Sequence, residues 1–327
     1  HASYVQRKGY ITDIMNGMAV DFVKRKHTKP WSLWFAHKAV HPDAEQAADG
    51  TFKMDGYVAA ERHRNLYRGC VFPKKPNMLP PEVVVKQKPA WAEAIELRSG
   101  RESRELPDAI HWGEQEEIRL RAAMMAAVDE GVGMIFDALE ETGQLDDTFI
   151  LFLGDNGYFF GEHCIGPERR FAYEEGIRSP FLVRYPGRVK AGSRVKDLVL
   201  CQDIAPTMLE LAGGRPGPHI QGRSLVPLLA RGRGKSGAGW RKSFLIEYWA
   251  ENAYPWLVSM TYKAVRTDRH KYIHWVNRGK RGELDELYDL ERDPYEVQNV
   301  IGRPAYRAVR DRLRRELRGL MAQASGL

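Results

Sequence analysis

Residues 148–173, with the sequence TFILFLGDNGYFFGEHCIGPERRFAY, constrain the fold more than any other stretch of the chain. The segment begins with an aromatic and aliphatic run at 148–153, which is typical of a strand buried on both faces of a parallel sheet. The run stops at Gly154, and Asp155 and Asn156 follow at once. Because open α/β sheets bind ligands at the carboxyl ends of their strands, the pattern predicts a ligand site at this point.

Asp155 and Asn156 are candidate metal ligands, because a carboxylate and an amide offer the hard oxygen atoms that Ca²⁺ and Mg²⁺ prefer. The residues that follow them have the density of charge expected of an anion-binding site: Glu162, His163, Glu168, Arg169 and Arg170. The dipeptide Asn156-Gly157 is also common in turns. The sequence by itself therefore leaves two interpretations open, a metal and anion site or a simple turn.

Length and composition indicate a globular protein. The chain has 327 residues, of which 43% are hydrophobic and 28% are charged. This length favours one large α/β domain with a smaller appendage. No apolar run reaches the roughly 18 to 20 residues that a membrane span requires. Three scattered cysteines, Cys70, Cys164 and Cys201, define neither a disulfide framework nor a metal site, so the redox compartment stays undecided.

The formal net charge of +7 could suggest a nucleic-acid-binding protein. The densest basic stretch, residues 303–318, nevertheless carries apolar residues at helical spacing. Its arginines are therefore expected on the solvated face of an amphipathic helix, and no nucleic acid partner is predicted. A positive surface would still raise the rate at which anionic substrates arrive.

Periodicity and turn signals predict alternating helices and strands before residue 236. The predicted elements are helices over 10–26, 114–142 and 202–212, and strands over 31–36, 148–153 and 181–185. This alternation favours an α/β fold with a mainly parallel sheet sandwiched by helices. The strand over 31–36 would deliver His37, Lys38 and, before Pro42, His41.

Residues 43–113 read as a long irregular excursion, because prolines interrupt them and their apolar residues have no sustained period. Such a segment is expected to shape a binding cleft or to be anchored by its aromatic residues. The aromatic residues concerned are Tyr57, Tyr67, Phe72, Trp91 and Trp112.

The last part of the chain reads as a separate small α+β subdomain. Residues 231–239, RGRGKSGAG, combine glycine and cations without apolar anchors, which is typical of a junction. Short strands are expected over 244–249, 260–266, 271–275 and 284–290, and the final amphipathic helix can cover their apolar face. The predicted domains are therefore an α/β domain at 1–235 and an antiparallel sheet with a helix at 236–327.

Several motifs, in one order, resemble the later two thirds of a type I sulfatase, a member of the alkaline-phosphatase-like superfamily. The resemblance covers nearly the whole chain and rests on residues 35–42, 127–133, 155–163, 173–180, 221–225, 265–272 and 286–294. It implies the alkaline-phosphatase-like fold and sulfate ester hydrolysis.

The resemblance also implies roles for particular residues. Asp155 and Asn156 match the family's Asp-Asn pair, which binds Ca²⁺, with Mg²⁺ as an alternative ion. His41, the histidine before proline, matches a sulfate contact. Arg169 stands where the family usually has a sulfate-binding Lys, and it can hold two oxyanion oxygens at once. Arg169 and His41 are thus the predicted catalytic residues, and His163 and the competing Arg170 are further predicted substrate contacts.

The family nucleophile is absent from this sequence. Type I sulfatases use a formylglycine made from Cys or Ser in a Cys/Ser-x-Pro-x-Arg motif, and no such motif occurs here. Since the chain starts at His1, without an initiating Met or a signal peptide, we expect a fragment whose upstream part holds the formylglycine and two further aspartate ligands. A degenerate relative without a nucleophile is the alternative.

Three functions follow as hypotheses. The first is a Ca²⁺-dependent sulfatase that acts on a sulfated sugar or polysaccharide. The second is a phosphodiester or phosphonate monoester hydrolase of the same superfamily, and the third is a non-catalytic binder of acidic glycans. Oligomeric state and localisation cannot be read from the chain, although the resemblance suggests a periplasmic or extracellular protein.

Overall fold

The computed structural model describes residues 7–46, 52–90, 115–166, 168–230, 233–234, 239–250, 260–276 and 284–326. The chain divides into two compact units. The first comprises residues 1–73 and 113–149, and the second comprises residues 74–112 and 150–327. The predicted boundary after residue 235 falls inside the second unit, where it stays a prediction.

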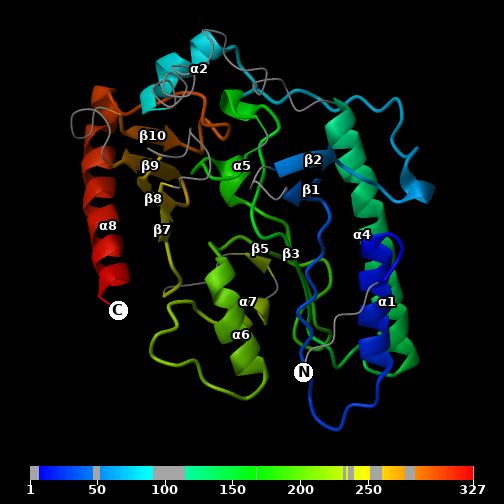
Figure 1. The fold of residues 1–327 in the computed structure, drawn as a ribbon. Helices are drawn as coiled ribbons and strands as arrows, with labels where there is room; N and C mark the ends of the chain where they lie inside the picture. The colour runs from blue at the N-terminus through cyan, green and yellow to red at the C-terminus, as the bar shows by residue number, and fades with distance from the viewer. Residues whose placement is uncertain are drawn as a thin grey trace. The chain divides into compact units, whose positions relative to one another are not determined.

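The first unit is built on two helices that lie side by side, α1 (Ile11–Lys24) and α4 (Gln115–Glu141) (Figure 1). Both helices were predicted. Two apolar residues of α1, Ile11 and Met18, are nevertheless 47% and 50% exposed. Asn16 is buried instead, and its Nδ2 donates to Ala127 O at 2.9 Å. A Cβ at Gly131 would lie 2.1 Å from Asn16 Oδ1, so glycine permits this close packing of the helices.

The predicted strand over 31–36 is wrong. Trp34 is 82% exposed, and no described strand pairs with this segment. Extended residues count as a strand only when a neighbour completes their hydrogen bonds. The excursion that follows is more regular than predicted, because β1 (Asp43–Gln46) pairs antiparallel with β2 (Phe52–Gly56), and η1 (Glu61–His63) comes next. Two of its aromatic residues, Trp91 and Trp112, lie outside the described residues.

The second unit contains the central strand, β3 (Ile150–Leu153), which pairs antiparallel with β4 (Phe181–Arg184). Its side chains are half-buried, whereas the sequence predicted burial on both faces. Among the described strands the parallel pair is β5 (Arg194–Val195) with β6 (Arg233–Gly234). Short helices among the described residues of this unit are α2 (Pro81–Gln87), α5 (Glu174–Ile177), α6 (Ile204–Leu211) and α7 (Val226–Leu229).

The second unit also contains the predicted C-terminal sheet. Its order is β10-β9-β8-β7, with every pair antiparallel. The strands are β7 (Ser243–Tyr248), β8 (Tyr262–Thr267), β9 (His270–Trp275) and β10 (Glu286–Asp289). The final helix, α8 (Arg307–Ser325), runs beside this sheet and buries Leu313 and Leu317 against Val265, Tyr272 and Leu287, as predicted (Figure 1).

The C-terminal strands also contribute to an aromatic core with the residues that follow β3. Phe159, Phe171 and Tyr173 are almost fully buried and share this core with Tyr262 and Trp275. The loop after β3 is therefore packed directly on the C-terminal sheet. None of the described helices is both long and apolar enough to cross a membrane.

Candidate functional site

The candidate site is the loop that follows β3, and three backbone hydrogen bonds hold it. Gly154 N donates to Pro180 O at 3.1 Å, Gly157 N donates to Gly176 O at 2.9 Å, and Phe159 N donates to Glu168 O at 2.9 Å. Residues 154–159 are thus hydrogen-bonded to residues 168–180. The predicted metal ligands, residues 155–156, lie between the first two of these bonds.

Two glycines bring the parts of this loop unusually close together. A Cβ at Gly157 would lie 1.9 Å from Glu175 O, and a Cβ at Gly176 would lie 3.2 Å from Arg169 O. Any larger residue would therefore force the segments apart. Gly176 thus accepts a hydrogen bond from Gly157, the residue after Asn156, and lies close to the backbone of Arg169. The turn interpretation of Asn156-Gly157 and the site interpretation are compatible.

Hydrogen bonds orient the side chains of Asp155 and Asn156. Asn156 N donates to Asp155 Oδ1 at 2.9 Å, and Asn156 Nδ2 donates to Gly157 O at 2.7 Å. Since the amide nitrogen is engaged by the loop, the amide oxygen is the end that remains for a ligand. Asp155 is exposed. An exposed carboxylate beside an oriented amide oxygen is a donor set that fits a hard divalent cation.

Arg169 and Arg170 differ in what their side chains already bind. The buried carboxylate of Glu168 accepts hydrogen bonds from Arg169 N at 2.7 Å, from Arg170 N at 3.1 Å and from Arg170 Nη1 at 2.8 Å. The Arg170 guanidinium is therefore partly neutralised. Arg169 is exposed, and no carboxylate in the described part of the chain pairs with its guanidinium. Of the two, Arg169 is the better placed to bind an anion.

His41 belongs to the first unit and comes far before Asp155 and Arg169 in the sequence. It is exposed, and its Nδ1 hydrogen-bonds to Pro42 O at 2.9 Å. Its backbone N donates to Lys38 O at 2.8 Å, which closes a turn. Because His41 belongs to a different unit from Asp155 and Arg169, its predicted role beside them stays a prediction.

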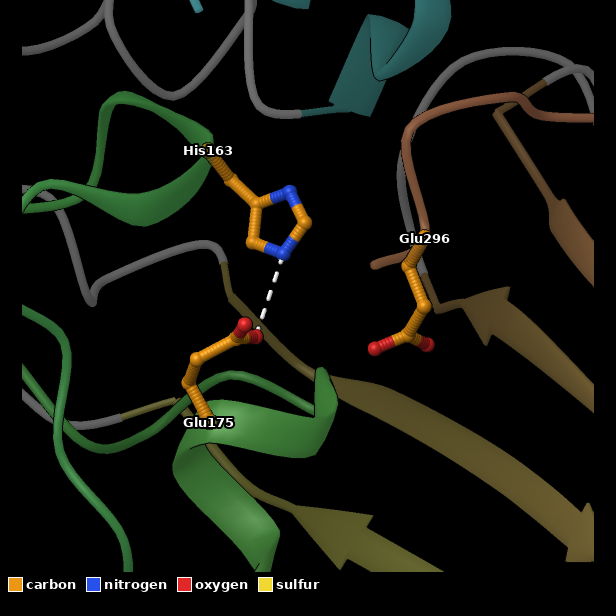
Figure 2. A group of neighbouring side chains, drawn as sticks. All are labelled: His163, Glu175 and Glu296. Carbon is orange, nitrogen blue, oxygen red and sulfur yellow. Dashed lines mark hydrogen bonds and ion pairs between the residues drawn. The ribbon is translucent and has the colours of Figure 1, made fainter. Parts of the chain in front are cut away.

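His163 is buried next to Glu175 and Glu296, as Figure 2 shows. His163 Nε2 lies 3.2 Å from Glu175 Oε2, and Asn77 Nδ2 donates to Glu175 Oε1 at 2.7 Å. Burial lowers the pKa of His163 to about 3, so its imidazole is neutral at neutral pH. Burial would raise the pKa of Glu175, but the hydrogen bonds from His163 and Asn77 outweigh it and lower the pKa to about 2.

One ligand atom from each of His163, Glu175 and Glu296 lies within 4.8 Å of the others, a spacing that a metal ion could use. Two buried ammonium groups, however, already occupy these surroundings. Lys271 Nζ lies 2.7 Å from Glu296 Oε1, and Lys88 Nζ donates to Glu296 O at 3.0 Å. A divalent cation here would be repelled by both lysines. The cluster of His163, Glu175 and Glu296 is therefore a buried ion network, and the oxygens of exposed Asp155 and half-buried Asn156 fit a cation better.

Sequence reasoning missed most of this network. Glu296 and Lys88 lie 208 positions apart, and no local pattern marks either as buried. The signals were His163, which was predicted as a substrate contact, and the turn Tyr173-Glu174-Glu175, which the motifs included without a role for its acids. Burial raises the pKa of Glu296 to about 7 and lowers that of Lys88 to about 8, so this network has a cost that the fold must offset.

Comparison with protein-family models gives two matches. Residues 2–214 match the model described as Sulfatase, and residues 161–323 match the model described as N-sulphoglucosamine sulphohydrolase, C-terminal. Among curated relatives, an N-acetylglucosamine-6-O-sulfatase of Bacteroides thetaiotaomicron is 30% identical. The match covers 93% of this chain and 60% of that protein, so the chain spans less than two thirds of the relative's length.

Among the solved structures that are similar to this one, two are informative about function. A protein in complex with its substrate D-glucosamine-2-N,6-O-disulfate has a TM-score of 0.79 at 28% identity, covering 98% of this chain and 71% of that one. A phosphonate monoester hydrolase of Agrobacterium radiobacter has a TM-score of 0.65 at 27% identity, covering 81% of this chain and 54% of that one. These likenesses confirm the predicted fold class.

Proposed function

The chain belongs to the sulfatase family, and from this premise we propose that it supplies the metal-binding and anion-binding half of a sulfuric ester hydrolase. The observation that carries the proposal is the loop after β3, where Gly157, directly after Asp155 and Asn156, is packed on the backbone of α5, and Gly176 of α5 lies close to the backbone of Arg169. In this arrangement the hard-oxygen pair and the Arg169 guanidinium, which pairs with no carboxylate among the described residues, belong to one loop. Both are groups that a sulfate ester and its counter-cation would use.

In this proposal Asp155 and Asn156 hold a divalent cation, Ca²⁺ with Mg²⁺ as the alternative. Such an ion, when bound, supplies positive charge that stabilises the oxygens of the ester in the transition state. The loop orients the oxygen donors in advance, because Asn156 Nδ2 is fixed by Gly157 O. Pre-oriented donors act without reorganisation at the moment of reaction, which is the usual source of electrostatic catalysis.

Arg169 binds the sulfate oxygens in this proposal, and Arg170 keeps the loop folded through Glu168. A guanidinium can donate two parallel hydrogen bonds to one sulfate, whereas the lysine usual in the family donates from a single point. The nucleophile is assigned to a formylglycine outside this chain, which has no Cys/Ser-x-Pro-x-Arg motif. Activity is therefore to be measured in the full-length protein, meaning the product of the complete reading frame that contains this chain.

His41 is proposed to protonate the departing alcohol, because it follows a turn and its imidazole is exposed. We expect His41→Ala to lower the rate for an alkyl or sugar sulfate much more than for an activated aryl sulfate, whose leaving group needs no proton. Initial rates on a series of sulfate esters with graded leaving groups measure this. Equal losses across the series would remove His41 from this role.

A sulfated amino sugar is the substrate class we propose. The support comes from the relative named N-acetylglucosamine-6-O-sulfatase and from the similar protein solved with a disulfated glucosamine. The likeness to a phosphonate monoester hydrolase favours a second candidate, hydrolysis of phosphonate or phosphate esters.

Kinetics of the full-length protein on matched esters separate these functions. We expect kcat/KM for glucosamine 6-sulfate to exceed that for glucosamine 6-phosphate, which has the same leaving group, by at least about a hundredfold, since each 1.4 kcal/mol of preferential transition-state binding contributes tenfold. The reverse preference would support the second candidate. Tight binding of the sulfated sugar without turnover, in protein whose mass shows a formylglycine, would instead indicate a non-catalytic glycan binder.

A further inference from the structure

The turn Tyr173-Glu174-Glu175, which opens α5, bonds three different parts of the second unit through three consecutive side chains. Their partners are, in order, Glu286 on β10, Arg266 on β8 with Lys271 on β9, and His163 with Asn77. The Tyr173 hydroxyl donates to Glu286 Oε2 at 2.9 Å, and Lys271 Nζ lies 2.9 Å from Glu174 Oε1. The C-terminal sheet is thus joined to α5 by buried polar contacts.

Glu296 also binds the turn Tyr173-Glu174-Glu175. Its Oε2 accepts a hydrogen bond from Glu174 N at 2.7 Å, while its Oε1 lies 2.7 Å from Lys271 Nζ. Both Glu296 and Lys271 are completely buried. Glu296 has a φ of +52°, a left-handed conformation that is uncommon for a non-glycine residue and is kept only where its surroundings require it. Lys271 therefore joins two carboxylates. One belongs to Glu174, the first residue of α5, and the other belongs to Glu296, which accepts a hydrogen bond from Glu174 N.

The same turn is packed against the candidate site. Gly176 O accepts the hydrogen bond from Gly157 N, and the Cβ position of Gly176 lies 3.2 Å from Arg169 O. The Cβ position of Gly157 lies 1.9 Å from Glu175 O. Backbone segments packed this closely leave no free space between them. A shift of α5 would therefore displace both the Asn156 turn and the Arg169 backbone.

We propose that the buried pair Lys271–Glu296 positions the Asp155–Asn156 turn and Arg169 for binding the cation and the sulfate. This inference rests on the proposed function. Both residues act through α5, since both are fully buried, and so they are positioning residues. A buried ion pair adds little net stability compared with an apolar pair, so a role in fixing one geometry accounts better for its presence.

The test compares Lys271→Met with Lys263→Met in the full-length protein. Lys263 is a matched control, because it is also buried in the sheet, on β8, and pairs with Glu247 Oε1 at 2.5 Å. Calorimetric titration with Ca²⁺ and kcat/KM on glucosamine 6-sulfate are measured beside the melting temperature. We expect Lys271→Met to weaken Ca²⁺ binding and kcat/KM by about 10- to 100-fold, the usual effect of losing an outer-shell partner. Lys263→Met should lower the melting temperature and change both constants less than about threefold.

Two further variants keep the test decisive. The double variant Lys271→Met with Glu296→Gln removes both charges together, so that no unpaired charge stays buried. Because the pair is still missing, we expect its Ca²⁺ affinity to stay as low as that of Lys271→Met, and recovery would overturn the inference. If Lys271→Met fails to fold, Glu296→Gln alone is used, because glutamine can still accept the hydrogen bond from Glu174 N. It should weaken Ca²⁺ binding at least about tenfold, the smallest effect usual when a residue that orients metal ligands is lost.

Equal effects of Lys271→Met and Lys263→Met would overturn the inference, as would an unchanged Ca²⁺ affinity in Glu296→Gln. Failure of the positioning role can be distinguished from failure of the proposed function. If Asp155→Asn lowers Ca²⁺ affinity and Lys271→Met acts like its control, only the positioning role is lost. If Asp155→Asn leaves Ca²⁺ affinity and hydrolysis unchanged, the proposed function itself is wrong.

Discussion

Asp155→Asn should lower kcat/KM of the full-length protein on glucosamine 6-sulfate by more than about a thousandfold, the largest effect expected of any change in this chain. The substitution keeps the size of the side chain and removes its charge, so the loop can still form. Asp155 Oδ1 accepts from Asn156 N, and an amide oxygen can replace it there. The loss should therefore appear as weaker Ca²⁺ binding, by at least about a hundredfold, with little change in melting temperature.

The control for this prediction is Asp137→Asn, which removes an exposed carboxylate from the outer face of α4. It should leave Ca²⁺ binding and turnover within about twofold of the unmodified protein, as expected of an exposed surface position. Added Ca²⁺ should restore part of the activity of Asp155→Asn. A fall in activity with unchanged Ca²⁺ affinity would contradict the metal-ligand role.

Arg169→Ala should lower kcat/KM for the sulfated sugar by about 10²- to 10³-fold, the cost of losing one charged donor to the developing anion. Its guanidinium is exposed, so folding should not depend on it. Arg169→Lys, which restores the residue usual in the family, should retain activity within about tenfold, because one charge remains while the paired hydrogen bonds are lost. Rates at saturating and at limiting substrate show whether the loss of activity lies in kcat or in KM.

Two other arginines provide the comparison. Arg188 is exposed in the turn after β4, at the opposite end of the β3–β4 pair, and Arg188→Ala should have no effect on rate. Arg170→Ala removes the ion pair to buried Glu168, so it should lower the melting temperature more than Arg169→Ala does. A larger loss of sulfate hydrolysis in Arg170→Ala than in Arg169→Ala, at equal stability, would assign the anion contact to Arg170.

The sequence predicted the elements whose pattern is local. Alternating strands and an amphipathic final helix follow directly from side-chain periodicity, and β7 to β10 with α8 form where expected. The strand over 31–36 failed because a strand needs a partner, which periodicity cannot supply. The face by which α1 packs on α4 could not be predicted either, because Asn16 and Gly131 let the two helices approach closely along a face of small and polar residues.

In the candidate site, too, some residues are marked by a local sequence pattern and others only by contacts between distant parts of the chain. Asp155, Asn156 and Arg169 could be predicted because they lie within one short stretch that also carries family motifs. Lys271 and Glu296 could not, because their role depends on contacts with α5 that join distant parts of the chain. The close approach at Gly157 and Gly176 was likewise visible only in the structure.

The central claim is that Asp155, Asn156 and Arg169 form one site for a divalent cation and a sulfate. A crystal structure of the full-length protein with Ca²⁺ and glucosamine 6-sulfate tests it most directly. We expect the cation to contact Asp155 and Asn156 and the sulfate oxygens to contact the Arg169 guanidinium. A cation bound instead among His163, Glu175 and Glu296, with the loop after β3 empty, would contradict the account.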